Sequence, residues 1–168
     1  MKKIIYSLLL VAATIFTSNA QRIAIVDINA VLGSMNEYTI AEKEIERISS
    51  EWRQEISKEY DKIKSLYNKY QAEQVLLSDD AKAERENEII KKEEEVRELQ
   101  RLKFGPEGEL FKKRQQMVAP IQDKVFTAIQ DYASDRGYDL IFDKASATGL
   151  LFTSPEFDKT EDIINKVK

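Results

Sequence analysis

Acidic clusters are the residues of this chain whose chemistry is easiest to specify. Asp79-Asp80 and Glu93-Glu94-Glu95 carry the oxygen donors that hard metal ions prefer, and two carboxylates at a fixed separation in a pocket can hydrolyse a glycosidic bond. Consecutive residues of a helix point in different directions, and no loop with calcium-binding spacing is present. We therefore interpret these acids as a solvated surface and expect neither a metal site nor a catalytic carboxylate pair.

Two of the five glycines lie close together in the segment Gly105-Pro106-Glu107-Gly108. A phosphate-binding P-loop adds a lysine with a serine or threonine and follows a strand, and this segment does neither. The chain also has no histidine and no cysteine, which removes the commonest general base and metal ligand, thiolate zinc sites and disulfides. We therefore expect that the protein is not an enzyme and binds no cofactor. We interpret residues 104–108 as a break or hinge between helices.

Long helices must position these residues. From Ser34 to Phe104 the chain has no glycine or proline, and nearly half of residues 37–103 are charged. Apolar side chains recur at about every fourth residue, which is the spacing of one helix face. They are Ile40, Ile45, Ile48, Trp52, Ile56, Tyr60, Ile63, Tyr67 and Tyr70. The pattern predicts a helix that begins near Asn36 and leaves only a narrow apolar stripe for a partner.

A turn is predicted at residues 75–80. Ser78 has the side chain of an N-cap, and Asp79 and Asp80 would lie at the positive end of a returning helix. Residues 37–103 would then form an antiparallel helical hairpin, a coiled-coil-like arm with its tip near 75–80. One continuous coiled-coil rod is the alternative, since little else marks the turn.

Both ends of the chain carry short runs of β-forming residues. Strands are predicted at Arg22–Asp27, Tyr138–Asp143 and Gly149–Thr153. A helix at 109–136 would lead back from the arm, and a last amphipathic helix would begin at Thr160. We expect residues 21–36 and residues 137–168 to form the two parts of one small body. A sheet of so few short strands has open edges, and we therefore expect this body to self-associate.

The first 20 residues are typical of a secretory signal peptide. Lys2 and Lys3 precede an apolar run, and Ser18-Asn19-Ala20 supplies small residues for cleavage before Gln21. The apolar run is shorter than the roughly 20 residues that cross a bilayer, so we expect no transmembrane segment in the mature chain. Lys and Arg number 26 against 30 Asp and Glu, and two of the 26 leave with the signal. This acidic balance argues against nucleic acid as a partner and leaves contact with a membrane surface open.

Both ends of the chain also resemble the Skp/OmpH family of periplasmic chaperones. The resemblance is carried by Arg22-Ile23-Ala24-Ile25-Val26-Asp27, by Tyr138-Asp139-Leu140-Ile141-Phe142-Asp143, and by Asp158-Lys159-Thr160 before a terminal helix. It implies an α+β, mostly helical fold in which hairpin arms extend from a β-rich body as a jellyfish-like homotrimer. It also implies an ATP-independent holdase that keeps unfolded outer-membrane β-barrel proteins in a cavity between its arms, in the periplasm.

Two sets of residues are candidates for binding. The apolar residues of the predicted strands are candidates for contacts in the trimer body: Ile23, Ile25, Val26, Leu140, Ile141, Phe142, Leu150 and Leu151. The arm aromatics Trp52, Tyr60, Tyr67 and Tyr70 either contact unfolded client proteins or pack the hairpin. A structural or adaptor coiled-coil protein that spaces components of the cell envelope is the alternative function.

Overall fold

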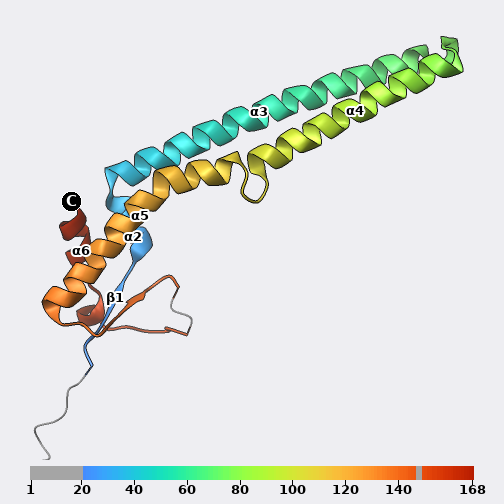
Figure 1. The fold of residues 1–168 in the computed structure, drawn as a ribbon. Coiled ribbons are helices and arrows are strands. Elements are labelled where there is room, and N and C mark those ends of the chain that lie inside the picture. The colour runs from blue at the N-terminus through green and yellow to red at the C-terminus, as the bar shows by residue number, and fades with distance from the viewer. Residues whose placement is uncertain (1–20, 147–148) are drawn as a thin grey trace, which may run out of the picture. The chain divides into compact units, whose positions relative to one another are not determined.

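The structure is a computed structural model that describes residues 21–146 and 149–168 (Figure 1). The predicted signal peptide lies outside the described residues. The described chain divides into two compact units, residues 32–124 and residues 21–31 with 125–168. The elements in chain order are β1 (Ile23–Val26), α2 (Ile28–Ser34), α3 (Asn36–Glu73), the 3₁₀ turn η2 (Gln74–Leu76), α4 (Asp79–Phe104), α5 (Glu109–Arg136), β2 (Leu140–Asp143), the 3₁₀ turn η3 (Pro155–Phe157) and α6 (Thr160–Val167).

The unit of residues 32–124 contains the predicted hairpin. Helices α3 and α4 run side by side in opposite directions (Figure 1). At the tip, the side-chain oxygen of Ser78 accepts a hydrogen bond from the backbone N–H of Ala81 at 3.4 Å, and Asp79 and Asp80 occupy the first turn of α4. The Ser78 cap satisfies an N–H group that has no partner within the helix. The two carboxylates interact favourably with the positive end of the helix dipole. The hairpin prediction is confirmed, and the alternative of one continuous rod is wrong.

A single row of apolar side chains joins the two helices of the hairpin. Ile56 and Ile63 of α3 and Ile89 and Val96 of α4 are buried together. Leu66, Tyr70, Leu99 and Phe104 pack against this row and are partly buried. The many exposed ion pairs outside it, such as Arg47 with Glu44, add little stability because water screens them. The core of the arm is therefore one side chain thick.

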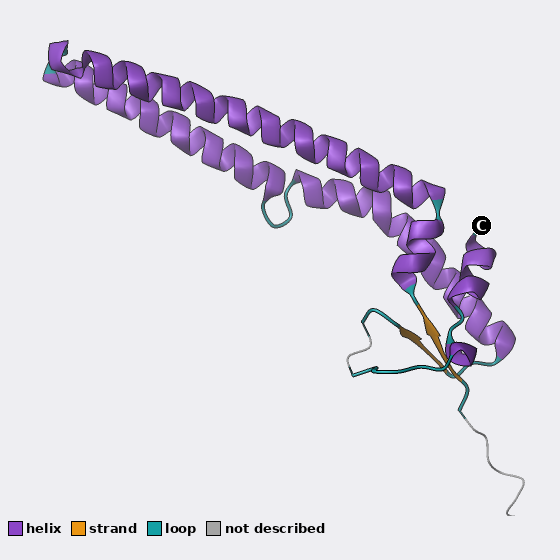
Figure 2. Ribbon diagram, turned by 180° about the vertical axis from the view of Figure 1, so that it is seen from behind, coloured by secondary structure: helices purple, strands orange, loops and turns teal. Residues whose placement is uncertain are grey.

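The predicted break separates α4 from α5 (Figure 2). The N–H of Gly105 donates to the carbonyl of Arg101 at 2.8 Å, and the N–H of Gly108 donates to the carbonyl of Gly105 at 2.9 Å. A Cβ on Gly105 would overlap the Arg101 carbonyl, and one on Gly108 would come within 2.8 Å of the Gly105 carbonyl oxygen. Backbone crowding therefore requires both glycines in this hydrogen-bonded turn.

The other unit is built around a parallel strand pair. In β1 and β2, Ile23 lies opposite Leu140 and Ile25 opposite Phe142. The second edge of β1 is partly covered, because the N–H of Lys159 donates to the carbonyl of Ile25 at 2.8 Å. The buried apolar residues of this unit are Ala24, Ile25, Val26, Val31, Val125, Ala128, Tyr132, Ile163, Ile164 and Val167. This core holds β1 with residues of α5 and α6.

The third predicted strand, Gly149–Thr153, is not formed. Residues 150–153 have no regular secondary structure, and the sheet of the described residues pairs β1 with β2 only. A strand requires a partner for its backbone hydrogen bonds, and β-forming side chains do not supply one. Leu151 and Phe152 are left 97% and 81% exposed.

Candidate functional site

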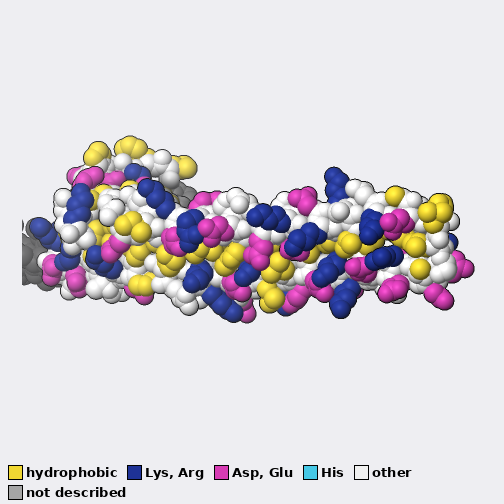
Figure 3. All heavy atoms as spheres, turned by 90° about the horizontal axis from the view of Figure 1, so that it is seen from above, with side chains coloured by type: hydrophobic (Ala, Val, Ile, Leu, Met, Phe, Trp, Pro, Cys, Tyr) yellow, Lys and Arg dark blue, Asp and Glu magenta, His cyan; other side chains and the backbone are white. Residues whose placement is uncertain are grey.

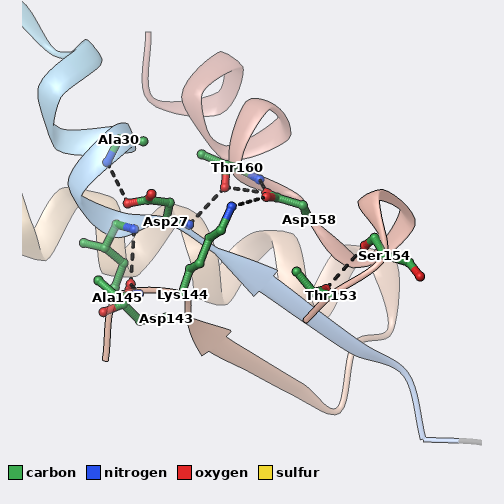
Figure 4. Close-up of polar contacts among 10 residues, drawn as sticks. Asp27, Ala30, Asp143, Lys144, Ala145, Thr153, Ser154, Asp158 and Thr160 are labelled. Atoms are coloured by element: carbon green, nitrogen blue, oxygen red, sulfur yellow. Dashed lines mark hydrogen bonds and ion pairs between the residues drawn. The ribbon is translucent and has the colours of Figure 1, made fainter. Parts of the chain in front are cut away.

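The residues that carry the family resemblance meet in a polar network (Figure 4). The Asp27 carboxylate accepts a hydrogen bond from the Ala30 N–H at 3.0 Å and so caps α2. The Asp27 N–H donates to the hydroxyl of Thr160 at 2.9 Å, and that hydroxyl donates to Asp158 at 2.6 Å. Lys144 forms an ion pair with Asp158 at 3.2 Å. The network joins the ends of β1 and β2 to the start of α6.

The two other network carboxylates are also occupied by protein donors. Asp143 accepts from the N–H groups of Ile28 at 3.4 Å and Ala145 at 3.3 Å. Burial raises the pKa of the Asp143 carboxyl, but hydrogen bonds from the Ser146 hydroxyl and from the N–H groups of Ala145, Ile28 and Ser146 outweigh burial and leave that pKa lowered. For Asp158 the hydroxyl of Thr160 is the main cause of a lowered pKa. Each of these acids accepts hydrogen bonds from several protein donors, which suits them to holding segments together.

The start of β1 is held by stacked side chains. The Arg22 guanidinium lies 4.9 Å from the centre of the Tyr138 ring, which stacks on Tyr132 at 5.8 Å. The N–H of Arg22 donates to Asp139 at 2.7 Å, and the Tyr132 hydroxyl donates to Asp162 at 2.5 Å. Burial and then this bond raise the pKa of Tyr132. Arg22 is thus held against the segment that leads from α5 into β2.

The candidate trimer contacts fall into two groups. Ile25 and Val26 are buried inside the protomer, and Ile23 and Ile141 are partly buried. Leu140 and Phe142 of β2 are 46% and 45% exposed, and the loop residues Leu150 and Leu151 are exposed as well. Phe152, which was not among the candidates, belongs to the same apolar run. We call Leu140, Phe142, Leu150, Leu151 and Phe152 the apolar edge.

The arm aromatics also divide. Trp52 packs edge-on against Phe104 with ring centres 6.2 Å apart, and the hydroxyl of Tyr70 donates to Glu86. Tyr60 and Tyr67 remain 43% and 51% exposed. Trp52 and Tyr70 therefore serve the packing of the hairpin, whereas Tyr60 and Tyr67 present aromatic surface to solvent.

A groove between α3 and α4 was not anticipated from the sequence. It encloses about 670 Å³, and we call it the arm groove. Its apolar lining comes from Ile63, Leu66, Val96 and Leu99, and its charged and polar lining from Glu59, Lys62, Ser65, Lys92 and Glu95. Figure 3 shows hydrophobic side chains in a broken line between charged ones along the arm. The helical periodicity indicated the apolar stripe but not its hollow.

No helix of the described residues is both long and apolar enough to cross a bilayer. Among solved structures, the chain is similar to a protein of Caulobacter crescentus described as a candidate OmpH-like outer membrane chaperone. The TM-score is 0.68 with 14% sequence identity, over 88% of this chain and 83% of that one. This similarity establishes the fold.

No curated protein sequence matches the chain. A sequence model of the family described as outer membrane protein (OmpH-like) matches residues 22–167. The match covers β1, the hairpin arm and the C-terminal segments that form the polar network. The chain therefore belongs to the OmpH-like family.

Proposed function

We propose that this protein is an ATP-independent holdase chaperone that binds unfolded outer-membrane β-barrel proteins in the periplasm. Membership of the OmpH-like family supports this function, as does a structural neighbour described as a candidate outer membrane chaperone. Export would follow cleavage of residues 1–20. The chaperone would prevent clients from aggregating on their way to the outer membrane.

The observation that carries the proposal is the open apolar surface of a highly charged arm. Tyr60 and Tyr67 are exposed on α3, and the arm groove has an apolar lining. Large, rigid aromatic side chains give contact area with little loss of rotamer freedom. Many weak contacts of this kind hold an unfolded chain without one deep site, and their effects combine because the contacts are linked.

We further propose that the protein works as a homotrimer whose arms surround the client. The apolar edge supports self-association, because Leu151 and Phe152 are 97% and 81% exposed on a segment without strand pairing. An unpaired strand edge beside exposed apolar residues is a template for pairing with another chain. A second and third copy would cover this surface and leave the arms to contact the client.

An aggregation assay tests the function. An unfolded outer-membrane β-barrel protein is diluted from urea with increasing amounts of the mature protein, and its turbidity is followed while native mass measurement gives the stoichiometry. We expect aggregation to be suppressed in proportion to the amount of trimer, with no effect of ATP. A structural or adaptor protein of the envelope would leave turbidity unchanged, and that result would reject the holdase.

A further inference from the structure

The arm groove has an apolar floor at a place where the hairpin core is incompletely covered. Ile63 and Val96 are buried members of the core row, and Leu66 and Leu99 are partly buried beside them. Ser65 also lines the groove and is itself exposed. Ser65 has the smallest side chain of the residues that line the groove.

The rims of the groove carry both signs of charge on both helices. On α3, Lys62 forms an ion pair with Glu59 at 2.6 Å. On α4, Lys92 forms an ion pair with Glu95 at 2.7 Å. Each rim therefore offers a hydrogen-bond donor and an acceptor, and the four side chains have no net charge.

This balance selects the kind of ligand. Anionic lipid and nucleic acid are attracted by an excess of Lys and Arg, which these rims lack. An extended polypeptide instead presents an N–H donor and a C=O acceptor at each residue except proline. Donors and acceptors on both rims match that pattern, while the floor accepts an apolar side chain.

An apolar floor between rims of mixed charge also occurs nearer the tip of the arm. A second, smaller hollow of about 30 Å³ shares Leu66 with the arm groove and is also lined by Ile89. Lys69 and Glu73 of α3 and Arg85 and Glu88 of α4 again supply both signs. The hollows follow one side of the hairpin, so a bound extended chain would run along the arm.

We propose that the arm groove binds an apolar side chain of an extended, unfolded polypeptide, whose backbone bonds to the mixed-charge rims. This inference rests on the proposed holdase function and assigns the place of client contact to the groove side of the arm. Exposed aromatics such as Tyr60 then supply additional area outside the groove.

The cysteine-free chain allows the groove to be blocked after folding. Ser65→Cys places a unique thiol in the groove lining, and Ser57→Cys places one at another exposed position of α3 as the matched control. Each folded, full-length mature variant is labelled with pyrene maleimide. Binding of a urea-unfolded outer-membrane β-barrel protein is measured by titration before and after labelling, and circular dichroism and native mass check fold and oligomeric state.

Blocking position 65 should weaken client binding roughly tenfold, the effect of losing one buried apolar side chain. Labelling position 57 should leave affinity within about twofold. An unchanged affinity at 65, or equal losses at both positions, would overturn the groove assignment. A label at position 65 that changes the oligomeric state would also overturn the assignment, because the groove would then hold another copy of the chain. If unlabelled protein binds no client, the holdase proposal itself fails.

Discussion

At the residue scale, Ser49 is a polar exception in the apolar stripe of α3. Its side chain is 2% exposed, and its hydroxyl has no hydrogen-bond partner among the described residues. A buried, unsatisfied hydroxyl costs free energy that an apolar side chain of similar size avoids. The stripe therefore contains one position at which polarity lowers the stability of the arm.

We predict that Ser49→Ala raises the free energy of unfolding by about 1 kcal/mol. Urea unfolding followed by circular dichroism measures the change, with Ser57→Ala, at an exposed position of the same helix, as the control. A loss of stability in Ser49→Ala would mean that the hydroxyl has a partner in solution.

Asp158 gives the polar network a dependence on pH. Its pKa is lowered chiefly by the Thr160 hydroxyl and further by Lys144. A folded pKa below the unfolded value adds stability above the ordinary titration range of a carboxyl group. That stability is lost as pH falls through the folded pKa. Acid should therefore loosen the joint between β1 and α6.

We predict that Asp158→Asn lowers stability at neutral pH by about 1 kcal/mol and flattens the decline of stability below about pH 4. Thermal unfolding across that range measures both effects, and Asp61→Asn at an exposed position of α3 is the control. Parallel pH profiles for wild type and Asp158→Asn would contradict the role of this carboxylate.

At the element scale, the turn between α4 and α5 depends on close backbone approach. Glycine at 105 and 108 leaves room for carbonyl oxygens that a Cβ would meet, and Glu107 has a φ of 60°, which is unfavourable for a residue with a side chain. Whether this turn also acts as a hinge stays a prediction. Broad spin-label distance distributions between arm tips would support a hinge, and narrow ones would not.

We predict that Gly108→Ala destabilises the arm by about 1–3 kcal/mol, because its Cβ would come within 2.8 Å of the Leu102 carbonyl oxygen. Gly33→Ala is the matched control, since a Cβ there meets no atom within 4 Å. Thermal unfolding compares the two variants. Equal stability of the two variants would contradict this prediction, because it would show that the turn rearranges without cost, for example into continuous helix.

At the scale of the whole molecule, two substitutions separate assembly from folding. Ile25 is 5% exposed inside the protomer, whereas Phe142 is 45% exposed on the apolar edge. An aspartate at 25 would bury an unpaired charge, and one at 142 would place a charge on the proposed contact surface. The body therefore has apolar residues that maintain the fold and others that are available for assembly.

We predict that Phe142→Asp yields a folded species of lower mass than wild type, and that Ile25→Asp loses structure. Light scattering gives the mass and circular dichroism the helix content. A wild-type protein that is already monomeric, or a Phe142→Asp variant that stays trimeric, would contradict the proposed assembly surface.

Client capture should depend little on salt. The chain carries 26 basic and 30 acidic side chains, and many on the arm pair within one helix, such as Arg85 with Glu88 at 2.9 Å. Screening weakens long-range attraction between charges, whereas apolar burial persists. Titrations of one unfolded β-barrel client at several salt concentrations should give similar affinities. A steep loss of affinity with salt would show that charge holds the client.

The sequence by itself determined the features that depend on near neighbours. Apolar spacing predicts α3, Ser78 predicts the tip, and the glycines around Pro106 predict the break, because helix faces, caps and breakers act within a few residues. The runs at 22–27 and 138–143 likewise indicate the strands and the family.

Only the tertiary structure decided which of these residues are available to a partner. It buries Ile25 and exposes Phe142, leaves residues 150–153 without a strand partner, and forms the arm groove from two helices. These properties depend on which segments distant in sequence lie together. Local periodicity carries no information about that pairing, because the same alternating apolar run serves a paired strand or an exposed edge.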